Sequence, residues 1–280
     1  MTHRVALLFL THRWDDVLRH RFERIVREAG ETADVFLLIR KCDETGQALA
    51  KFPPRAGKLA GFDQEHLAQK LGFPTMKPDA LVPGSTHFPI MAFHRQLPDY
   101  IHYFAVEFDV EFTGNWGALV RDVTGQAPDF ASMHFHTPDE KPDWRWWDHC
   151  HPAQADCDWA SDRANLRRSF NPVYCLSNSA IEQLDQAHRD GWKGHYEVLL
   201  ATILTQRGGK IVDLGDYCIG EEQNPKPGKP VDTISTFRWR PNVSQRELLR
   251  RSTGKTLFHP VKDAWFFDGE RIVDLTGSDA

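Results

Sequence analysis

The sequence has no hydrophobic run long enough to cross a membrane. Its most apolar N-terminal stretch, residues 5–10, is VALLFL, and polar residues follow it directly. A membrane-spanning helix needs about 20 apolar residues, and the apolar part of a signal peptide needs about 7 to 15. We therefore expect a protein without an integral membrane segment, located in the cytoplasm.

Cysteine is scarce and irregularly spaced. An odd number of cysteines far apart in the chain does not suit a disulfide framework. We expect reduced thiols, as in cytoplasmic proteins. The 5 cysteines are Cys42, Cys150, Cys157, Cys175 and Cys218.

The sequence also lacks a long basic block. It has 34 Lys and Arg against 39 Asp and Glu, with a formal net charge of -5 and the two signs well mixed. Proteins that bind nucleic acid usually carry a clustered excess of positive charge. We expect no nucleic-acid partner.

No internal repeat, low-complexity tract or clear linker divides the chain, so a single domain over residues 1–280 is the simplest organisation. Its opening has a strand–helix–strand pattern. Residues 4–12 (RVALLFLTH) form an apolar run, residues 14–30 show apolar positions at helical spacing up to Gly30, and ADVFLLIRK follows. This order predicts an α/β fold with a mixed, mostly parallel sheet flanked by helices.

Two carboxylates, Glu107 and Asp109, interrupt the apolar run IHYFAVEFDV at residues 101–110, and Glu111 follows it. As one strand, residues 101–112 would place Glu107, Asp109 and Glu111 on the same face, because alternate residues of a strand point the same way. Ligands of open α/β sheets bind outside the carboxyl ends of strands, where these acids fall. Paired carboxylates suit Mg²⁺ or Mn²⁺. The alternative is an edge strand with an acidic, solvated face.

A later helix, GHYEVLLATIL at residues 194–204, carries one acid in its first turn. Glu197 there suits a general base that takes a proton from a hydroxyl group. The alternative is an acid that simply favours the positive end of the helix dipole. His195 and Tyr196 precede it and could line an acceptor pocket.

Four stretches, in this order, resemble the GT-A class of nucleotide-sugar glycosyltransferases: VALLFLTHR, VEFDVEFTGNW, GHYEVLLATIL and TLFHPVK. The resemblance covers roughly residues 4–262. In that family a Rossmann-like start holds the nucleotide and a D-x-D motif at a strand end binds the metal. Here the motif is E-x-D, with Glu107 in the place of the first Asp.

The resemblance implies a division of labour along the chain. About residues 1–125 would form the nucleotide- and donor-binding half of a GT-A-like domain, and about 126–280 the acceptor-binding half. The implied reaction moves a sugar from a nucleotide-sugar donor to a glycan or glycolipid acceptor. Assembly of a surface polysaccharide or a glycolipid head group would suit such a cytoplasmic enzyme.

The resemblance also implies roles for individual residues. Asp109, Glu107 and His259 are expected to hold a divalent metal, Mn²⁺ or Mg²⁺, and Glu197 to act as base. Glu107 is also expected to contact the donor. The other expected donor-binding residues are Thr11, Arg13, Asn115, Trp116 and Lys262.

The segment 134–151 supports other hypotheses. Its pairs His134-x-His136 and His149-x-His151 could build the metal site of a hydrolase, and Cys150 with Cys157 a structural zinc site. Trp146 and Trp147 lie in the same segment and could stack on an acceptor sugar. A third hypothesis is a carbohydrate-binding protein that keeps the fold without turnover.

Overall fold

The computed structural model describes residues 4–77, 80–220, 235–251, 254–262 and 264–275. Its centre is a seven-stranded sheet in the order β10-β6-β8-β4-β1-β2-β3. The strands are β1 (Val5–Thr11), β2 (Asp34–Arg40), β3 (Lys58–Phe62), β4 (His102–Glu107), β6 (Phe130–His136), β8 (Arg168–Ser177) and β10 (Ile211–Asp213).

The sheet is mixed and mostly parallel. β1 pairs in parallel with β2 and β4, β2 with β3, and β6 with β10, whereas β8 runs antiparallel to both β4 and β6. The predicted fold class is confirmed. β4 lies in the interior of the sheet, between β1 and β8, so its carboxyl end is flanked by two strands.

The sheet is buried on both faces, as the unbroken apolar runs predicted. Leu7 and Phe9 of β1 belong to one core cluster, and Ala6 and Leu8 belong to the other. The helices divide accordingly. The cluster that contains Leu7 and Phe9 includes side chains of α1 (Asp16–Ala29), α2 (Asp43–Lys51) and α5 (Trp116–Thr124). The cluster that contains Ala6 and Leu8 includes side chains of α3 (Leu67–Leu71), α4 (Phe88–Gln96), α7 (Asn178–Asp190) and α8 (Tyr196–Gln206).

Short elements complete the described chain. No helix among the described residues is both long enough and apolar enough to span a bilayer. All five cysteines are free thiols. The short elements are β5 (Glu111–Phe112), β7 (Cys150–His151), β9 (Lys193–Gly194), β11 (Leu257–Phe258), β12 (Trp265–Phe267), β13 (Ile272–Asp274), α6 (Cys157–Ala160), α9 (Gln245–Arg251) and four 3₁₀ turns, Trp147–His149, Gln154–Asp156, Arg163–Asn165 and Leu214–Asp216.

One prediction about the acid motif is wrong. The segment 101–112 is not a single strand, because β4 ends at Glu107 and the chain turns before β5 begins at Glu111. The three acids therefore do not share a strand face. The apolar pattern of the sequence predicts neither β6 at Phe130–His136 nor β8 at Arg168–Ser177, yet both strands pair within the main sheet.

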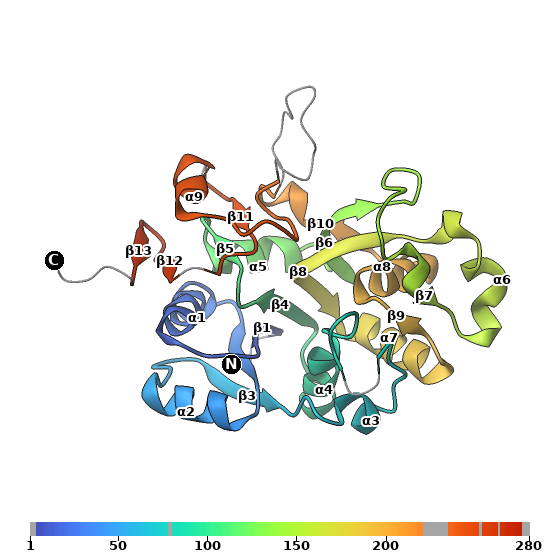
Figure 1. Ribbon diagram of the computed structural model, residues 1–280, viewed down its shortest axis with the longest axis horizontal. Coiled ribbons are helices and arrows are strands. Elements are labelled where there is room, and N and C mark those ends of the chain that lie inside the picture. Colours follow the sequence, from blue (N-terminus) through green and yellow to red (C-terminus); the bar gives the residue numbers. More distant parts are fainter. Residues whose placement is uncertain (1–3, 78–79, 221–234, 252–253, 263, 276–280) are drawn as a thin grey trace.

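The C-terminal part of the chain returns to this turn. β11 pairs antiparallel with β5, so that Leu257 lies opposite Phe112 and Phe258 opposite Glu111. Figure 1 shows β11 and α9 beside β5, above α1. Segments about 150 residues apart in the sequence are therefore neighbours at the carboxyl end of β4.

Candidate active site

The acid motif is shaped by a tight turn at the end of β4. The backbone N–H of Phe108 donates to the carbonyl of Leu10 on β1, at 3.1 Å. The N–H of Val110 donates back to the carbonyl of Glu107, also at 3.1 Å. The turn places Asp109 beyond the sheet edge and next to Glu107.

The C-terminal segment brings His259 to this turn. Pairing between β5 and β11 fixes the register, and the N–H of Val261 donates to the carbonyl of Asp109 at 2.8 Å. The N–H of His259 itself donates to the carbonyl of Thr236 at 3.0 Å. Backbone hydrogen bonds therefore decide where the imidazole lies.

Glu107, Asp109 and His259 form a compact group. His259 Nε2 lies 3.4 Å from Asp109 Oδ1 and 3.8 Å from Glu107 Oε2. One ligand atom from each residue lies within 4.8 Å of the others, and no other set of three or more His, Cys, Asp or Glu side chains in the described part of the chain does so. Asp109 Oδ1 is buried without a hydrogen-bond partner. Two carboxylates and an imidazole fit a divalent cation.

The orientation of His259 suits a metal ligand. Its Nδ1 lies 2.7 Å from the carbonyl oxygen of Arg238, which can only accept, so Nδ1 carries a proton and Nε2 faces the acids. Metal-bound histidines usually donate their other ring N–H to a carbonyl or carboxylate in this way. Nothing in the sequence pointed to Arg238, because the contact uses a main-chain atom.

The three side chains of this group shift one another's pKa values. Burial raises the pKa of Glu107, and the neighbouring charge of Asp109 raises it further. Burial also opposes ionisation of Asp109, but His259 outweighs that effect and the pKa of Asp109 is lowered. For His259, burial lowers the pKa, whereas Asp109 and Glu107 together raise it above the ordinary value. The site therefore favours bound positive charge.

The start of α8 is held beside this group by a close approach of two segments. A Cβ on Gly194 would lie 1.9 Å from the carbonyl oxygen of His149, and the glycine has a φ of +150°. The short strands β7 and β9 pair here, and the N–H of His195 donates to the His149 carbonyl at 2.8 Å. Only glycine fits this contact, which sets the position of the first turn of α8.

Glu197 is buried in that first turn, at 8% exposure. Its Oε2 lies 3.8 Å from His195 Nδ1. Burial raises the pKa of Glu197 to about 7, against the opposing influence of Arg168 and a backbone N–H of Asn171. Glu197 follows Tyr196, whose hydroxyl lies 3.5 Å from Glu107 Oε1, and the charge of Glu197 also raises the pKa of Glu107.

Cationic side chains gather on the other side of Asp109. Lys262 Nζ lies 3.8 Å from Asp109 Oδ2, and the Arg13 guanidinium lies over the Phe108 ring at 5.1 Å. Burial lowers the pKa of His12, and the charges of Arg13 and Lys262 add to this effect. Thr11 ends β1 and is buried, and its hydroxyl donates to the Arg13 carbonyl at 2.6 Å. The structure thus places Thr11, Arg13 and Lys262 around the turn.

Asn115 and Trp116 are engaged elsewhere. The Asn115 side chain caps α5 by accepting from the N–H of Ala118 at 2.8 Å. Trp116 is 2% exposed and packs on Phe112 at 5.0 Å between ring centroids. These contacts give both residues a structural role at the start of α5, and contact with a donor sugar stays a prediction.

The His- and Trp-rich segment does not assemble a metal centre among the described residues, which include both H-x-H pairs, Cys150 and Cys157. Trp147 is 2% exposed and its indole N–H donates to the Lys141 carbonyl at 2.7 Å, so its ring is covered. Trp146 is half-buried, stacks on His195 at 4.6 Å and lies under Arg145 at 4.4 Å. The segment forms part of the surroundings of α8.

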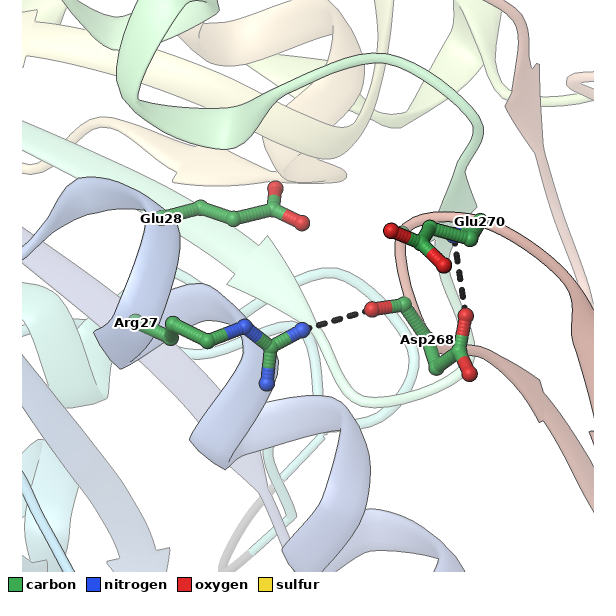
Figure 2. Close-up of a pocket in the computed structure, with 5 residues that line it drawn as sticks. Arg27, Glu28, Asp268 and Glu270 are labelled. Carbon is green, nitrogen blue, oxygen red and sulfur yellow. Dashed lines mark hydrogen bonds between the residues drawn. The ribbon is translucent and has the colours of Figure 1, made fainter.

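A pocket of about 450 Å³ lies at the far end of α1, between this helix and the β12–β13 hairpin (Figure 2). Arg27 donates to the carbonyl of Asp268 at 2.6 Å, and Glu28 pairs with Arg24 at 2.7 Å. Arg27, Glu28 and Asp268 therefore already pair with groups of the chain. None of the residues predicted for function lines this pocket, and we assign it no chemistry.

Comparisons with known proteins identify a structural likeness only. No protein-family model matches the chain, and no curated protein matches it. A crystal structure described as a "putative nucleotide-diphospho-sugar transferase" from Desulfovibrio desulfuricans G20 is similar, with 9% sequence identity and a TM-score of 0.41 over 76% of this chain and 80% of that one. Evidence for a function comes from the residues of this chain.

Proposed function

We propose that the protein is a glycosyltransferase that uses a nucleotide-sugar donor and a divalent cation, with a glycan or glycolipid as acceptor. The observation that carries this proposal is the convergence of Glu107, Asp109 and His259 at the carboxyl end of β4, where Glu107 contacts Tyr196, the residue before Glu197. Mn²⁺ or Mg²⁺ bound there would offset the negative charge that develops on a departing nucleoside diphosphate.

The surrounding cations support a diphosphate-bearing ligand. Arg13 and Lys262 lie on the solvent side of the turn, and Arg40 ends the adjacent strand β2. Their charges are close enough to lower the pKa of His12, after the effect of burial. In our proposal these side chains bind and orient the donor, with Lys262 next to Asp109 contacting the diphosphate.

Glu197 has the surroundings of a general base. In the proposed reaction it takes the proton from an acceptor hydroxyl whose oxygen attacks the anomeric carbon of the donor sugar. A new glycosidic bond forms, and the bond to the diphosphate breaks with its electron pair leaving on the diphosphate. Burial raises the pKa of Glu197 to about 7, which suits proton transfer near neutral pH. This role presumes inversion at the anomeric carbon.

Thermal unfolding with a panel of nucleoside diphosphates and nucleotide sugars, with and without Mn²⁺, tests the proposal. A ligand that binds only the folded state raises the midpoint of unfolding, by an amount that grows with ligand concentration over Kd. We expect one nucleotide to raise the midpoint in a Mn²⁺-dependent way and so to identify the donor. Stabilisation by Zn²⁺ alone, with no response to any nucleotide, would instead favour the hydrolase hypothesis.

A further inference from the structure

The two carboxylate oxygens of Glu107 face different neighbours. Oε2 lies 3.8 Å from His259 Nε2, toward the position where a cation would bind. Oε1 lies 3.5 Å from the hydroxyl of Tyr196, which donates to it at the long end of hydrogen bonding. One oxygen is therefore free for a cation while the other contacts a protein donor.

Tyr196 is itself held on several sides. Its N–H donates to the carbonyl of Gly84 at 2.9 Å, and its ring lies parallel to that of His87, with centroids 6.0 Å apart and 5° between the planes. The side chain is 8% exposed. Tyr196 is the first residue of α8, and Glu197 follows it. The start of this helix therefore contacts the acid motif and also carries the proposed base.

A second tyrosine lies on the same side of the sheet. Tyr174 on β8 is opposite Ala105 on β4, two residues before Glu107, and both Ala105 and Tyr174 belong to one core cluster. Tyr174 is 2% exposed, and its hydroxyl has no hydrogen-bond partner among the described residues. A buried hydroxyl without a partner is costly, and such exceptions in a folded protein call for an explanation. Burial raises the pKa of this phenol, and the charge of Glu107 raises it further.

We propose that Tyr196 and Tyr174 are positioning residues for the metal ligand Glu107: the Tyr196 hydroxyl donates to its carboxylate on the side away from His259, and the buried Tyr174 hydroxyl is a second donor on the same side of the sheet. With Oε2 as the oxygen that would hold a cation, Oε1 would stay available to these hydroxyl donors. This inference rests on the metal site of the proposed function. It adds two residues that contact neither metal nor substrate and act through Glu107.

Mn²⁺ titration of the full chain, followed by the electron paramagnetic resonance signal of free Mn²⁺, tests this inference without any turnover. Partners of this kind typically change metal affinity by about 10- to 100-fold. We expect Tyr196→Phe to raise the Kd for Mn²⁺ by about tenfold and Tyr174→Phe by less, because only the Tyr196 hydroxyl already contacts Glu107. Phenylalanine keeps both rings in the core, so the variants should fold.

Tyr103→Phe is the matched control. Tyr103 is as deeply buried in β4, but its hydroxyl donates to the carbonyl of Leu97 at 2.8 Å, away from the site. Its removal should lower the unfolding midpoint and leave the Kd unchanged. Equal Kd values for wild type and Tyr196→Phe would overturn the inference alone. An equal rise in Tyr103→Phe would also overturn it. Absence of Mn²⁺ binding by the wild type would overturn both the inference and the proposed metal site.

Discussion

Three acids belong to the same motif, but the surroundings of Glu107 and Asp109 are opposite to those of Glu111. Glu111 is 2% exposed, and its Oε1 lies 2.7 Å from Arg21 Nε. Arg24 approaches its other oxygen at 3.8 Å. Glu107 and Asp109 instead face each other and one imidazole, that of His259.

The arginines around Glu111 also connect distant parts of the fold. Arg21 donates to the carbonyls of Phe108 at 3.1 Å and Trp265 at 2.8 Å, which ties α1 to the acid turn and to the C-terminal segment. Burial raises the pKa of Glu111, although Arg21 and Arg24 oppose this. Acids at regular spacing in one motif therefore differ in role, and the spacing alone does not assign it. An acid that pairs with two buried arginines stabilises the fold, whereas two acids that face each other and an imidazole are suited to bind a cation.

Asp109→Asn should show the largest effect. The substitution keeps the size of the side chain and removes the charge, so we expect transfer to fall by on the order of a thousandfold, as several kcal/mol of charge stabilisation would be lost. The rate of nucleotide release from the donor measures transfer, after the thermal-unfolding experiments have identified that donor. The variant should still unfold cooperatively. Near-normal transfer by a folded Asp109→Asn protein would contradict the proposed metal role.

Glu111→Gln should lower the stability of the fold, in contrast to Asp109→Asn. Removing one partner of a buried ion pair leaves Arg21 buried and unpaired, which costs about 3–5 kcal/mol of unfolding free energy. Urea denaturation measures this loss, and Asp109→Asn provides the matched control with a smaller change. Mn²⁺ binding by the folded fraction should persist in Glu111→Gln. An unfolding free energy equal to that of the wild type would show that the pair is not structural.

Glu197→Gln should lower kcat by about a hundredfold or more and leave Mn²⁺ binding intact, since general-base catalysis typically supplies that factor. With its pKa raised to about 7, wild-type activity should decline as the pH falls through 7, because the protonated acid cannot accept a proton. A pH–rate profile checks this. If the activity of Glu197→Gln still declined as the pH falls through 7, a group other than Glu197 would be responsible for the pH dependence.

The same pKa has a smaller consequence for stability. A pKa raised from 4.5 to about 7 on folding means that the stabilising effect of proton binding is fully present below 4.5 and is lost as the pH rises through 7. Relative to the wild type, Glu197→Gln should therefore gain more in unfolding midpoint at pH 8 than at pH 5. An equal gain at both pH values would argue against the raised pKa.

The regular elements with strong patterns were predictable. The apolar run at β1, the helical spacing of α1 and the next run at β2 indicated a parallel α/β sheet, and the structure confirms it. β6 and β8 were missed, because His, Asn and Pro occur within them and the alternation is broken by irregular register between the two strands. Only the neighbouring strands show that these segments belong to the sheet.

The acid motif was likewise located from the sequence, but its geometry was not. Strand alternation predicted that Glu107, Asp109 and Glu111 point the same way, whereas the turn after Glu107 separates Glu111 from the other two. Whether a strand continues for two more residues depends on partners for its backbone, and here the C-terminal β11 supplies a partner only from Glu111 onward.

The sequence by itself determined the α/β class, the position of two acids at the end of a buried strand, and an acid in the first turn of an apolar helix. These follow from local periodicity, which each segment carries alone. Tertiary structure decided that His259 meets Asp109, that Tyr196 contacts Glu107 and that Glu111 pairs with Arg21. Those contacts join segments about 90 to 150 residues apart, and their geometry is set by strand pairing and core packing that no local pattern encodes.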